Sequence, residues 1–138
     1  MTEKEFLDLL FERYTQEVSE DIPDDLGFYL GYYLDNYPSE KLGLLISRKT
    51  AARIIHEFMV NVLKWKDVDW KDAAKLKDIY DCRVCSNAIA QVYVRGIIGE
   101  AAPGVFDLDK TFTTQEGTEI IGRLLAMTKS HGNEQSRK

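Results

Sequence analysis

Two cysteines lie three positions apart in Cys82-Arg-Val-Cys85, which is the spacing of redox-active pairs and of zinc ligands. A structural zinc site needs four ligands, and His56 and His131 are the two histidines available to complete it. A thioredoxin-like pair needs a surrounding βαβ pattern, which this sequence lacks. Because small sulfur side chains are commonly buried, we expect both cysteines to pack in a core. A disulfide or redox pair and a metal site are the alternatives.

A cluster of three cations marks the start of a predicted helix that follows Ser47. Arg48, Lys49 and Arg53 lie in its first turns. The positive end of the helix dipole disfavours cations there, so Arg48 and Lys49 are placed against local preference. They are either solvated at the surface or part of a binding site for a negatively charged group.

Aromatic residues gather in two places. The first group lies within residues 28–37, and the second, Trp65 and Trp70, flanks a predicted turn. Aromatic rings dominate cores and interfaces, so we expect the first group to pack there, with a sugar-stacking platform as the alternative. The two tryptophans and nearby tyrosines are candidate stacking faces for a sugar.

The sequence contains no recognisable catalytic constellation. It has no glycine-rich phosphate loop and no serine in a nucleophile elbow, and two histidines offer little material for general acid–base catalysis. Asp107-Leu-Asp109 resembles a calcium loop, but Phe112 and Thr118 occupy the positions where an EF-hand requires glycine and glutamate. We therefore expect a non-enzymatic protein without a cofactor or a bound metal.

Composition narrows the class of protein further. The chain has 138 residues, 44% of them hydrophobic, which suits one domain with a real core. A net charge of -5 disfavours a nucleic-acid partner, because no basic surface is evident to neutralise phosphates. No apolar run approaches the length of a membrane span. The N-terminus lacks the regions of a signal peptide, so the sequence as written predicts a cytoplasmic protein, or else a piece of an exported one.

Helical periodicity and capping signals predict an all-α fold. Capping boxes at Thr2/Glu5 and Thr113/Glu116 open the first and last helices, and Ser47 caps a mostly buried one. Gly96 stands where a left-handed C-terminal stop belongs. Asp69 and Asp81 are the predicted caps of two further helices. The expected helices cover residues 2–18, 23–37, 47–63, 70–76, 82–95 and 113–127, and the polar residues 128–138 are expected to be disordered.

The helix at 47–63 and the last helix share a pattern. Residues 46–59 align with residues 112–125: each has an apolar residue, a hydroxyl cap, a polar first turn, Ile-Ile and two more apolar residues. Aligned units of this kind indicate a repeat that buries its apolar face against its copies. We expect one domain over 1–127, in which 38–64 ends a first repeat, 65–127 forms a second, and 1–37 supplies N-terminal helices as a degenerate third wedge.

The ordered motifs of residues 65–125 resemble the S-layer homology repeat. They are Trp65-Lys-Asp-Val68, Ala88-Ile89, Gly96-Ile-Ile-Gly99, Gly104-Val-Phe106 and Thr113-Thr-Gln-Glu116 through Leu125. Ser47-Arg-Lys-Thr50-Ala-Ala-Arg-Ile-Ile looks like the end of another such repeat. The resemblance implies a helical module in which three repeats pack around a pseudo-threefold axis.

Members of that family anchor bacterial surface proteins to acidic, often pyruvylated, secondary cell-wall polysaccharide. The resemblance therefore implies a glycan groove in which Arg48 holds the acidic sugar, with Ser47, Trp65, Trp70, Gly96 and Gly99 as the other candidate ligand-binding residues. In the second repeat, Thr114 stands where the family pattern has this arginine. The alternative function is a cytoplasmic helical protein-interaction domain that keeps the fold and lacks the glycan site.

Overall fold

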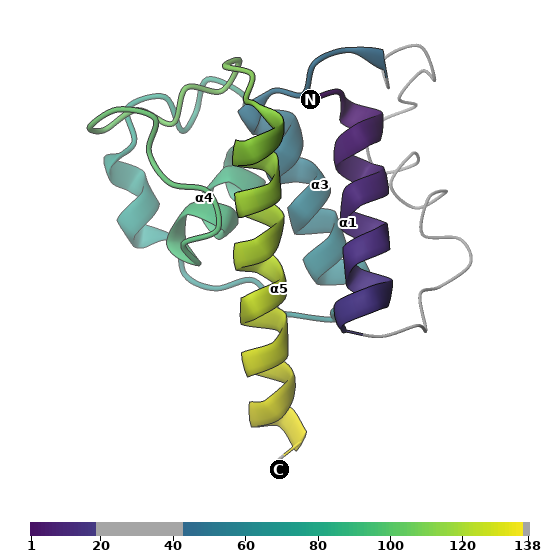
Figure 1. Cartoon of the computed structure of the whole chain (residues 1–138). Helices are drawn as coiled ribbons and strands as arrows, with labels where there is room; N and C mark the ends of the chain where they lie inside the picture. Colours follow the sequence, from purple (N-terminus) through teal and green to yellow (C-terminus); the bar gives the residue numbers. More distant parts are fainter. Residues whose placement is uncertain (19–42, 137–138) are drawn as a thin grey trace.

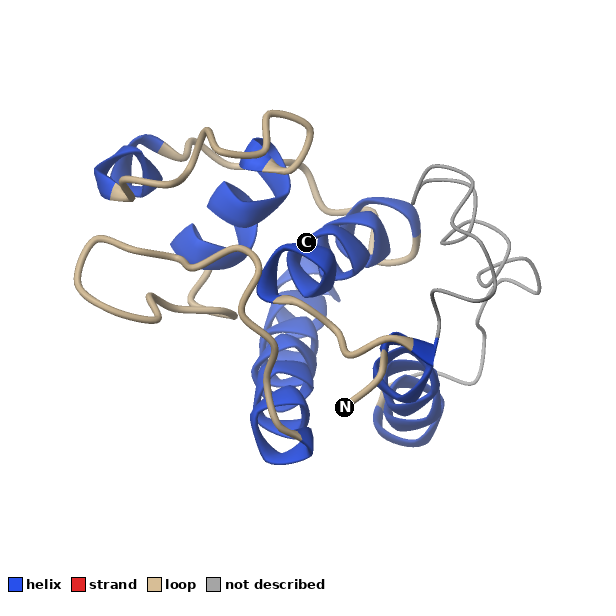
Figure 2. Ribbon diagram, turned by 90° about the horizontal axis from the view of Figure 1, so that it is seen from above, coloured by secondary structure: helices blue, strands red, loops and turns tan. Residues whose placement is uncertain are grey.

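The computed structural model describes residues 1–18 and 43–136, with side chains described as far as Lys129. The predicted helix at 23–37, its aromatic group and most of the connection after it lie outside the described residues. Within the described ranges the elements are α1 (Glu3–Glu17), α3 (Arg48–Asn61), the 3₁₀ helix η2 (Lys71–Lys75), α4 (Ser86–Val94) and α5 (Thr114–Ser136). Helices joined by long loops make up this part of the chain, which confirms the all-α prediction (Figure 2).

Hydroxyl caps start the three long helices. Thr2 and Glu5 form the predicted capping box of α1, in which each side chain binds the other's backbone N–H. The Ser47 hydroxyl accepts from the Thr50 N–H at the start of α3, and the Thr113 hydroxyl accepts from the Glu116 N–H at 3.1 Å. These local signals placed all three helix starts correctly.

Helices α1, α3 and α5 begin at the same end of the molecule and run in the same general direction (Figure 1). Their facing sides form one core, in which the Phe6 ring meets Phe112 edge-on at 5.9 Å and Tyr14 meets Phe58 at 5.2 Å. Helix α4 packs on α3 on the far side from α1. Full burial of such a side chain stabilises the fold by about 1.5–3 kcal/mol, so this core is the main source of stability.

Two segments that precede helices pair with the cap of an earlier helix. Thr2, the cap of α1, forms an antiparallel bridge with Leu45, two residues before the cap of α3. Ser47, the cap of α3, forms one with Thr111, two residues before the cap of α5. The chain therefore enters α3 and α5 by the same backbone contact.

The predicted starts of two short helices need correction. Helix α4 begins at Ser86 and not at Cys82, because residues 82–85 form a turn that a disulfide between Cys82 and Cys85 closes. Asp81 is therefore not the cap of α4. The element at 70–76 is a 3₁₀ helix of five residues, and Asp69 does accept a hydrogen bond from the N–H of Lys71 at 2.9 Å.

The last helix continues beyond residue 127, where it was expected to end, and α5 extends to Ser136. Thr128 is buried, and its hydroxyl donates to the Leu124 carbonyl one turn earlier at 2.8 Å. Lys129 reaches across to Glu17 of α1, with 3.2 Å between the charged atoms. Helix α5 thus still contacts α1 at Lys129, beyond the apolar residues that predicted it.

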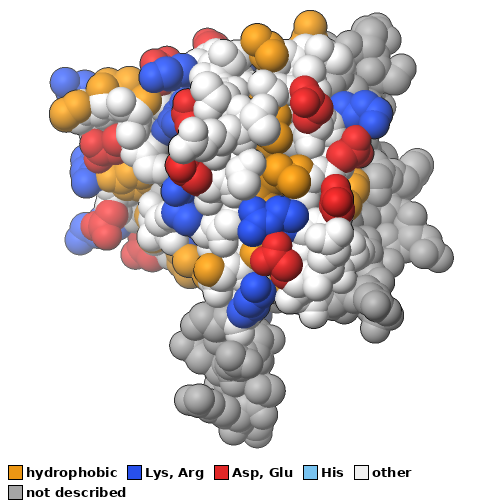
Figure 3. Space-filling model, viewed as in Figure 1, with side chains coloured by type: hydrophobic (Ala, Val, Ile, Leu, Met, Phe, Trp, Pro, Cys, Tyr) orange, Lys and Arg blue, Asp and Glu red, His pale blue; other side chains and the backbone are white. Residues whose placement is uncertain are grey.

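The surface carries charges of both signs. On the face shown in Figure 3, acidic and basic side chains are interspersed, and apolar side chains form small separate groups. Among the described helices, none has both the length and the apolar character needed to cross a bilayer.

Candidate functional site

Arg48 is a buried residue, with 9% of its surface exposed. Its Nε donates to the Phe106 carbonyl at 2.7 Å, and its Nη2 donates to the Gly99 carbonyl. The guanidinium also lies 4.8 Å from the centre of the Phe106 ring, in a cation–π contact. The interpretation of Arg48 as a solvated cation is therefore wrong. Its charge binds the loop between α4 and α5.

The backbone at the start of α3 is occupied by the same loop. The N–H groups of Arg48 and Lys49 donate to the carbonyls of Lys110 and Leu108, at 2.9 and 3.0 Å. These donors would otherwise be free to bind an anion at the helix N-terminus. A negatively charged ligand at this position must compete with the chain's own carbonyls.

Burial and charge act in opposite directions on Arg48. Burial lowers the pKa of its guanidinium, and the negative charges of Glu116, Asp107 and Asp78 oppose this effect. An arginine remains protonated under all ordinary conditions. The side chain is thus a permanent buried cation whose hydrogen-bond partners are carbonyl groups.

Asp78 holds the other side of the loop. Its two carboxylate oxygens accept from the backbone N–H groups of Phe106 and Asp107, at 3.0 and 2.7 Å. Asp107 has a left-handed backbone with φ 68°, a conformation that Asp tolerates better than most residues. Arg48 and Asp78 together fix the path of the loop from opposite sides.

Three other residues predicted to line the glycan groove, Ser47, Gly96 and Gly99, lie beside Arg48 or at the end of a helix. Ser47 is the half-buried cap of α3. Gly96 has φ 75°, which confirms the predicted left-handed stop after α4. Gly99 offers its carbonyl to Arg48. The structure thus brings Arg48, Ser47 and Gly99 together.

The two tryptophans differ in exposure. Trp65 is 7% exposed, and the Arg95 guanidinium lies 5.0 Å from its ring centre, so the expectation that Trp65 offers an open stacking face is not met. Trp70 is half-buried, and its ring centre lies 6.1 Å from that of Tyr80. Trp70 is therefore the predicted tryptophan that remains available to a ligand.

Trp70 and Tyr80 border two hollows in the surface. One, of about 260 Å³, is lined by Trp70, Lys71 and Tyr80 among others. The other, of about 590 Å³, is lined by Tyr80, Arg83 and Ser86. Tyr80 is 63% exposed and belongs to both, so the hollows are neighbours. We call this surface the Trp70–Tyr80 face, consisting of Trp70, Lys71, Tyr80, Arg83 and Ser86.

A disulfide joins Cys82 to Cys85 beside this face. Cys85 is buried, as expected for a core cysteine, but the covalent bond corrects the prediction of two packed thiols in favour of the disulfide alternative. Zinc would need the thiolates that this bond consumes. In the described part of the chain, no three acidic, histidine or cysteine side chains gather in a way that could hold a metal ion.

Polar contacts hold the linker between α3 and η2. Gln91 of α4 is almost fully buried, and its amide bonds both the N–H and the carbonyl of Val68, at 2.9 and 2.8 Å. Asp67 accepts from Asn87 and contacts His56, each at 2.8 Å. Burial raises the pKa of Asp67, but these two hydrogen bonds outweigh it, and its pKa lies below the ordinary value.

Searches against protein-family models, curated proteins and solved structures find no match to this chain.

Sequence reasoning missed three residues that shape these sites. Arg83 lies inside the turn that the disulfide closes and Tyr80 lies two residues before it, and both are exposed. Gln91 gave a readable signal, since it is a long amide within the otherwise apolar run of residues 88–94. A buried amide in such a run must find hydrogen-bond partners.

Proposed function

We propose that this chain is a non-catalytic binding module of the S-layer-homology type that attaches to acidic secondary cell-wall polysaccharide. The observation that carries the proposal is the repeated entry into the long helices. Thr2 with Leu45 and Ser47 with Thr111 form the same bridge at the same distance from the next cap. A repeat built on a hydroxyl cap, as in the family pattern, accounts for both contacts.

The next backbone contact repeats as well. The first residue of α1, Glu3, donates its N–H to the Leu44 carbonyl at 3.0 Å. The first residue of α3, Arg48, donates to the Lys110 carbonyl at 2.9 Å. Both acceptors lie three residues before the following cap, so bridge and hydrogen bond occupy equivalent positions in the two cases.

Burial along the three helices follows the same spacing. Counted from Thr2, Ser47 and Thr113, the fourth, eighth and twelfth residues are buried in every helix. They are Phe6, Leu10 and Tyr14; Ala51, Ile55 and Met59; and Gly117, Ile121 and Leu125. This register supports α1 as the third, degenerate wedge beside α3 and α5.

The first residue contributes to closing this arrangement. A methyl group built on Gly117 of α5 would collide with the Met1 side chain, which precedes the cap of α1. Contacts therefore lead from α1 to α3, from α3 to α5 and from α5 back to the start of α1. Such a closed set of capped helices is what the resemblance implies.

The disulfide favours the wall-binding proposal over a cytoplasmic one. Disulfides persist in oxidising surroundings such as the cell surface, and cytosolic reductants keep thiols reduced. The Cys82–Cys85 bond is thus better suited to an exported module.

Co-sedimentation with Gram-positive wall sacculi tests the proposal. The protein is expected to sediment with intact sacculi and to remain in solution with sacculi stripped of secondary polysaccharide. Removal of the pyruvyl groups by mild acid is expected to weaken binding, because a cationic side chain loses its carboxylate partner. Equal sedimentation with stripped sacculi, or none with either, would refute the proposal.

A protein-interaction domain is the second candidate. Neither repeat offers the arginine of the family motif to a glycan. Arg48 donates to carbonyls of the protein itself, and Thr114 stands at the arginine position of the other repeat. Val84, an apolar residue with 78% of its surface exposed, would then contact a protein. Concentration-dependent mass in light scattering, together with no binding to sacculi, would support this candidate.

A further inference from the structure

We infer that the Trp70–Tyr80 face, and not a groove at Arg48, is where this module holds an acidic saccharide. The inference rests on the proposed function and assigns its ligand to a different part of the molecule. It commits to one occupant, a sugar chain that carries carboxylate groups.

The two arginines differ in the hydrogen-bond donors they offer. Arg48 has Nε and Nη2 bound to carbonyls, and the Phe106 ring covers one side of its guanidinium. Arg83 is exposed, and its side chain makes no hydrogen bond or ion pair with any residue that the structure describes. A guanidinium binds a carboxylate through two parallel N–H donors, and only Arg83 of the two has them both available without rearrangement.

The aromatic rings supply the second part of a saccharide site. The planes of the Trp70 and Tyr80 rings are inclined to one another by 59°, and their centres lie 6.1 Å apart, so the two rings stand side by side at this surface. Aromatic rings of this kind combine an apolar face with a polar edge, which suits the apolar faces and hydroxyl rims of sugars. The larger hollow, of about 590 Å³, is shallow and open to solvent, so a saccharide chain could lie along it between Tyr80 and Arg83.

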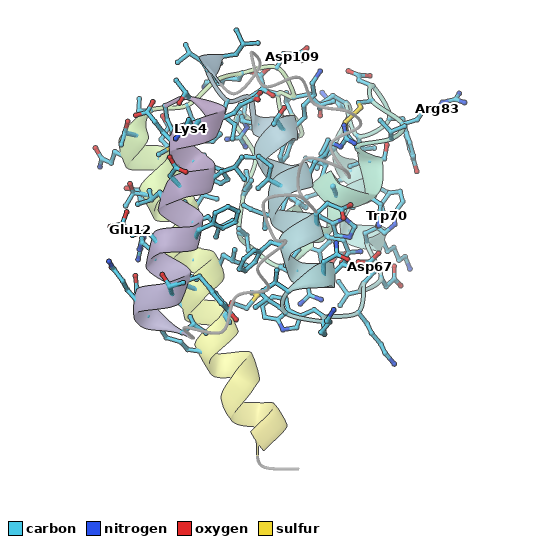
Figure 4. The ribbon with its side chains drawn as sticks, turned by 90° about the vertical axis from the view of Figure 1, so that its right-hand side faces the viewer. Lys4, Glu12, Asp67, Trp70, Arg83 and Asp109 are labelled. Carbon is cyan, nitrogen blue, oxygen red and sulfur yellow. A yellow bond between two sulfur atoms is a disulfide. The ribbon has the colours of Figure 1, made fainter. Side chains whose placement is uncertain are left out.

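Charge around the face is consistent with a carboxylate. Lys71 borders the smaller hollow and Arg83 the larger one, so each hollow has one cation at its edge. Asp69 also lines the smaller hollow and its carboxylate offsets the charge of Lys71 there, so the larger hollow, which Arg83 borders, is the one that favours an anion. Figure 4 shows Trp70 and Arg83 on the same side of the molecule, with Arg83 extending away from the helices.

The turn that carries Arg83 is held in place from within. The disulfide joins its two ends at Cys82 and Cys85. The buried Ser86 hydroxyl bonds the carbonyls of Ile79 and Cys82, at 2.7 and 3.0 Å. An anchored turn limits the conformational entropy lost when Arg83 and Tyr80 bind a ligand, which favours affinity.

The test compares Trp70→Ala and Arg83→Ala with Lys110→Ala, the matched removal of an exposed cation on another loop. The probes are intact sacculi and purified pyruvylated wall polysaccharide. We expect the first two variants to bind about tenfold more weakly and Lys110→Ala to bind like the unchanged protein. Circular dichroism of each variant checks that the helices are retained.

Tryptophan fluorescence gives an independent readout. Trp70 is the more exposed of the two tryptophans, so soluble polysaccharide is expected to change the emission of the unchanged protein and not that of Trp70→Ala. Equal binding by all variants would overturn this inference and leave the proposed function standing. No binding by the unchanged protein would overturn both. Binding of a proline-rich peptide at this face, without polysaccharide, would replace the saccharide by a protein partner.

Discussion

Arg48 and Arg83 show what the same side chain does in two regions of one small molecule. Arg48 begins a long helix, is buried, and binds two carbonyls of the loop that crosses over it. Arg83 lies in a four-residue turn, is exposed, and borders a surface hollow. The resemblance to the S-layer homology repeat predicted that the first arginine, Arg48, holds the ligand. The second arginine has the donors that a ligand could use, so the residue of the family motif serves the fold, and the residue proposed for binding lies outside the motif.

The largest effect is expected from Arg48→Ala. The variant leaves the Phe106 and Gly99 carbonyls without their charged donor and removes the packing on the Phe106 ring. We expect the free energy of unfolding to fall by about 3 kcal/mol, measured by urea denaturation. Arg83→Ala is the matched control and should change it by less than about 0.5 kcal/mol. Similar values for both variants would remove the contrast between the two arginines.

The double variant Cys82→Ser/Cys85→Ser tests the support of the Arg83 turn. Chain entropy for so short a loop predicts a loss of about 2 kcal/mol in the free energy of unfolding. Binding to sacculi should weaken as well, because Arg83 and Tyr80 lose their anchored turn. A variant with reduced stability and unchanged binding would show that the disulfide serves the fold alone.

Ser86→Ala should have a smaller effect on the same turn. The Ser86 hydroxyl bonds two carbonyls, but the Cys82 carbonyl also accepts from the N–H of Cys85 and stays satisfied. We expect a loss of about 1 kcal/mol in a thermal or urea melt. Thr118→Ala removes an exposed hydroxyl that bonds the carbonyl one turn back, and it should change the melt less. The reverse order would contradict the role given to Ser86.

The smallest effect concerns the linker before the Trp70–Tyr80 face. The folded protein lowers the pKa of Asp67, so the ionised carboxylate contributes stability above its unfolded pKa of about 4. That contribution is lost as the pH falls through the lower folded value. Unfolding measured from neutral to acidic pH should therefore show a weaker acid dependence in Asp67→Asn. The exposed Asp72→Asn should keep the dependence of the unchanged protein, and an equal change in both would argue against the Asp67 contacts.

The sequence determined the helices and their starts where the signal was local. Thr2 with Glu5, Ser47 and Thr113 each placed a cap correctly, because a hydroxyl that binds an N–H three residues on requires only neighbouring residues. Gly96 likewise stopped its helix, since a left-handed residue favours glycine wherever it occurs. The helical spacing of the apolar residues then predicted which helix faces form the core.

Tertiary structure decided the rest, because it depends on residues distant in the sequence. Arg48 is buried because a loop more than fifty residues later places its carbonyls there. Helix α5 was expected to end near residue 127, but Thr128 is buried and Lys129 lies 3.2 Å from Glu17 of α1, a residue more than a hundred positions earlier. Trp65 and Trp70 are the same residue type five positions apart, but Trp65 belongs to the core and has the Arg95 guanidinium over its ring, while Trp70 is only partly buried at the edge of the core. Spacing in the sequence reports neighbours along the chain, and exposure is set by what the rest of the chain brings to each side chain.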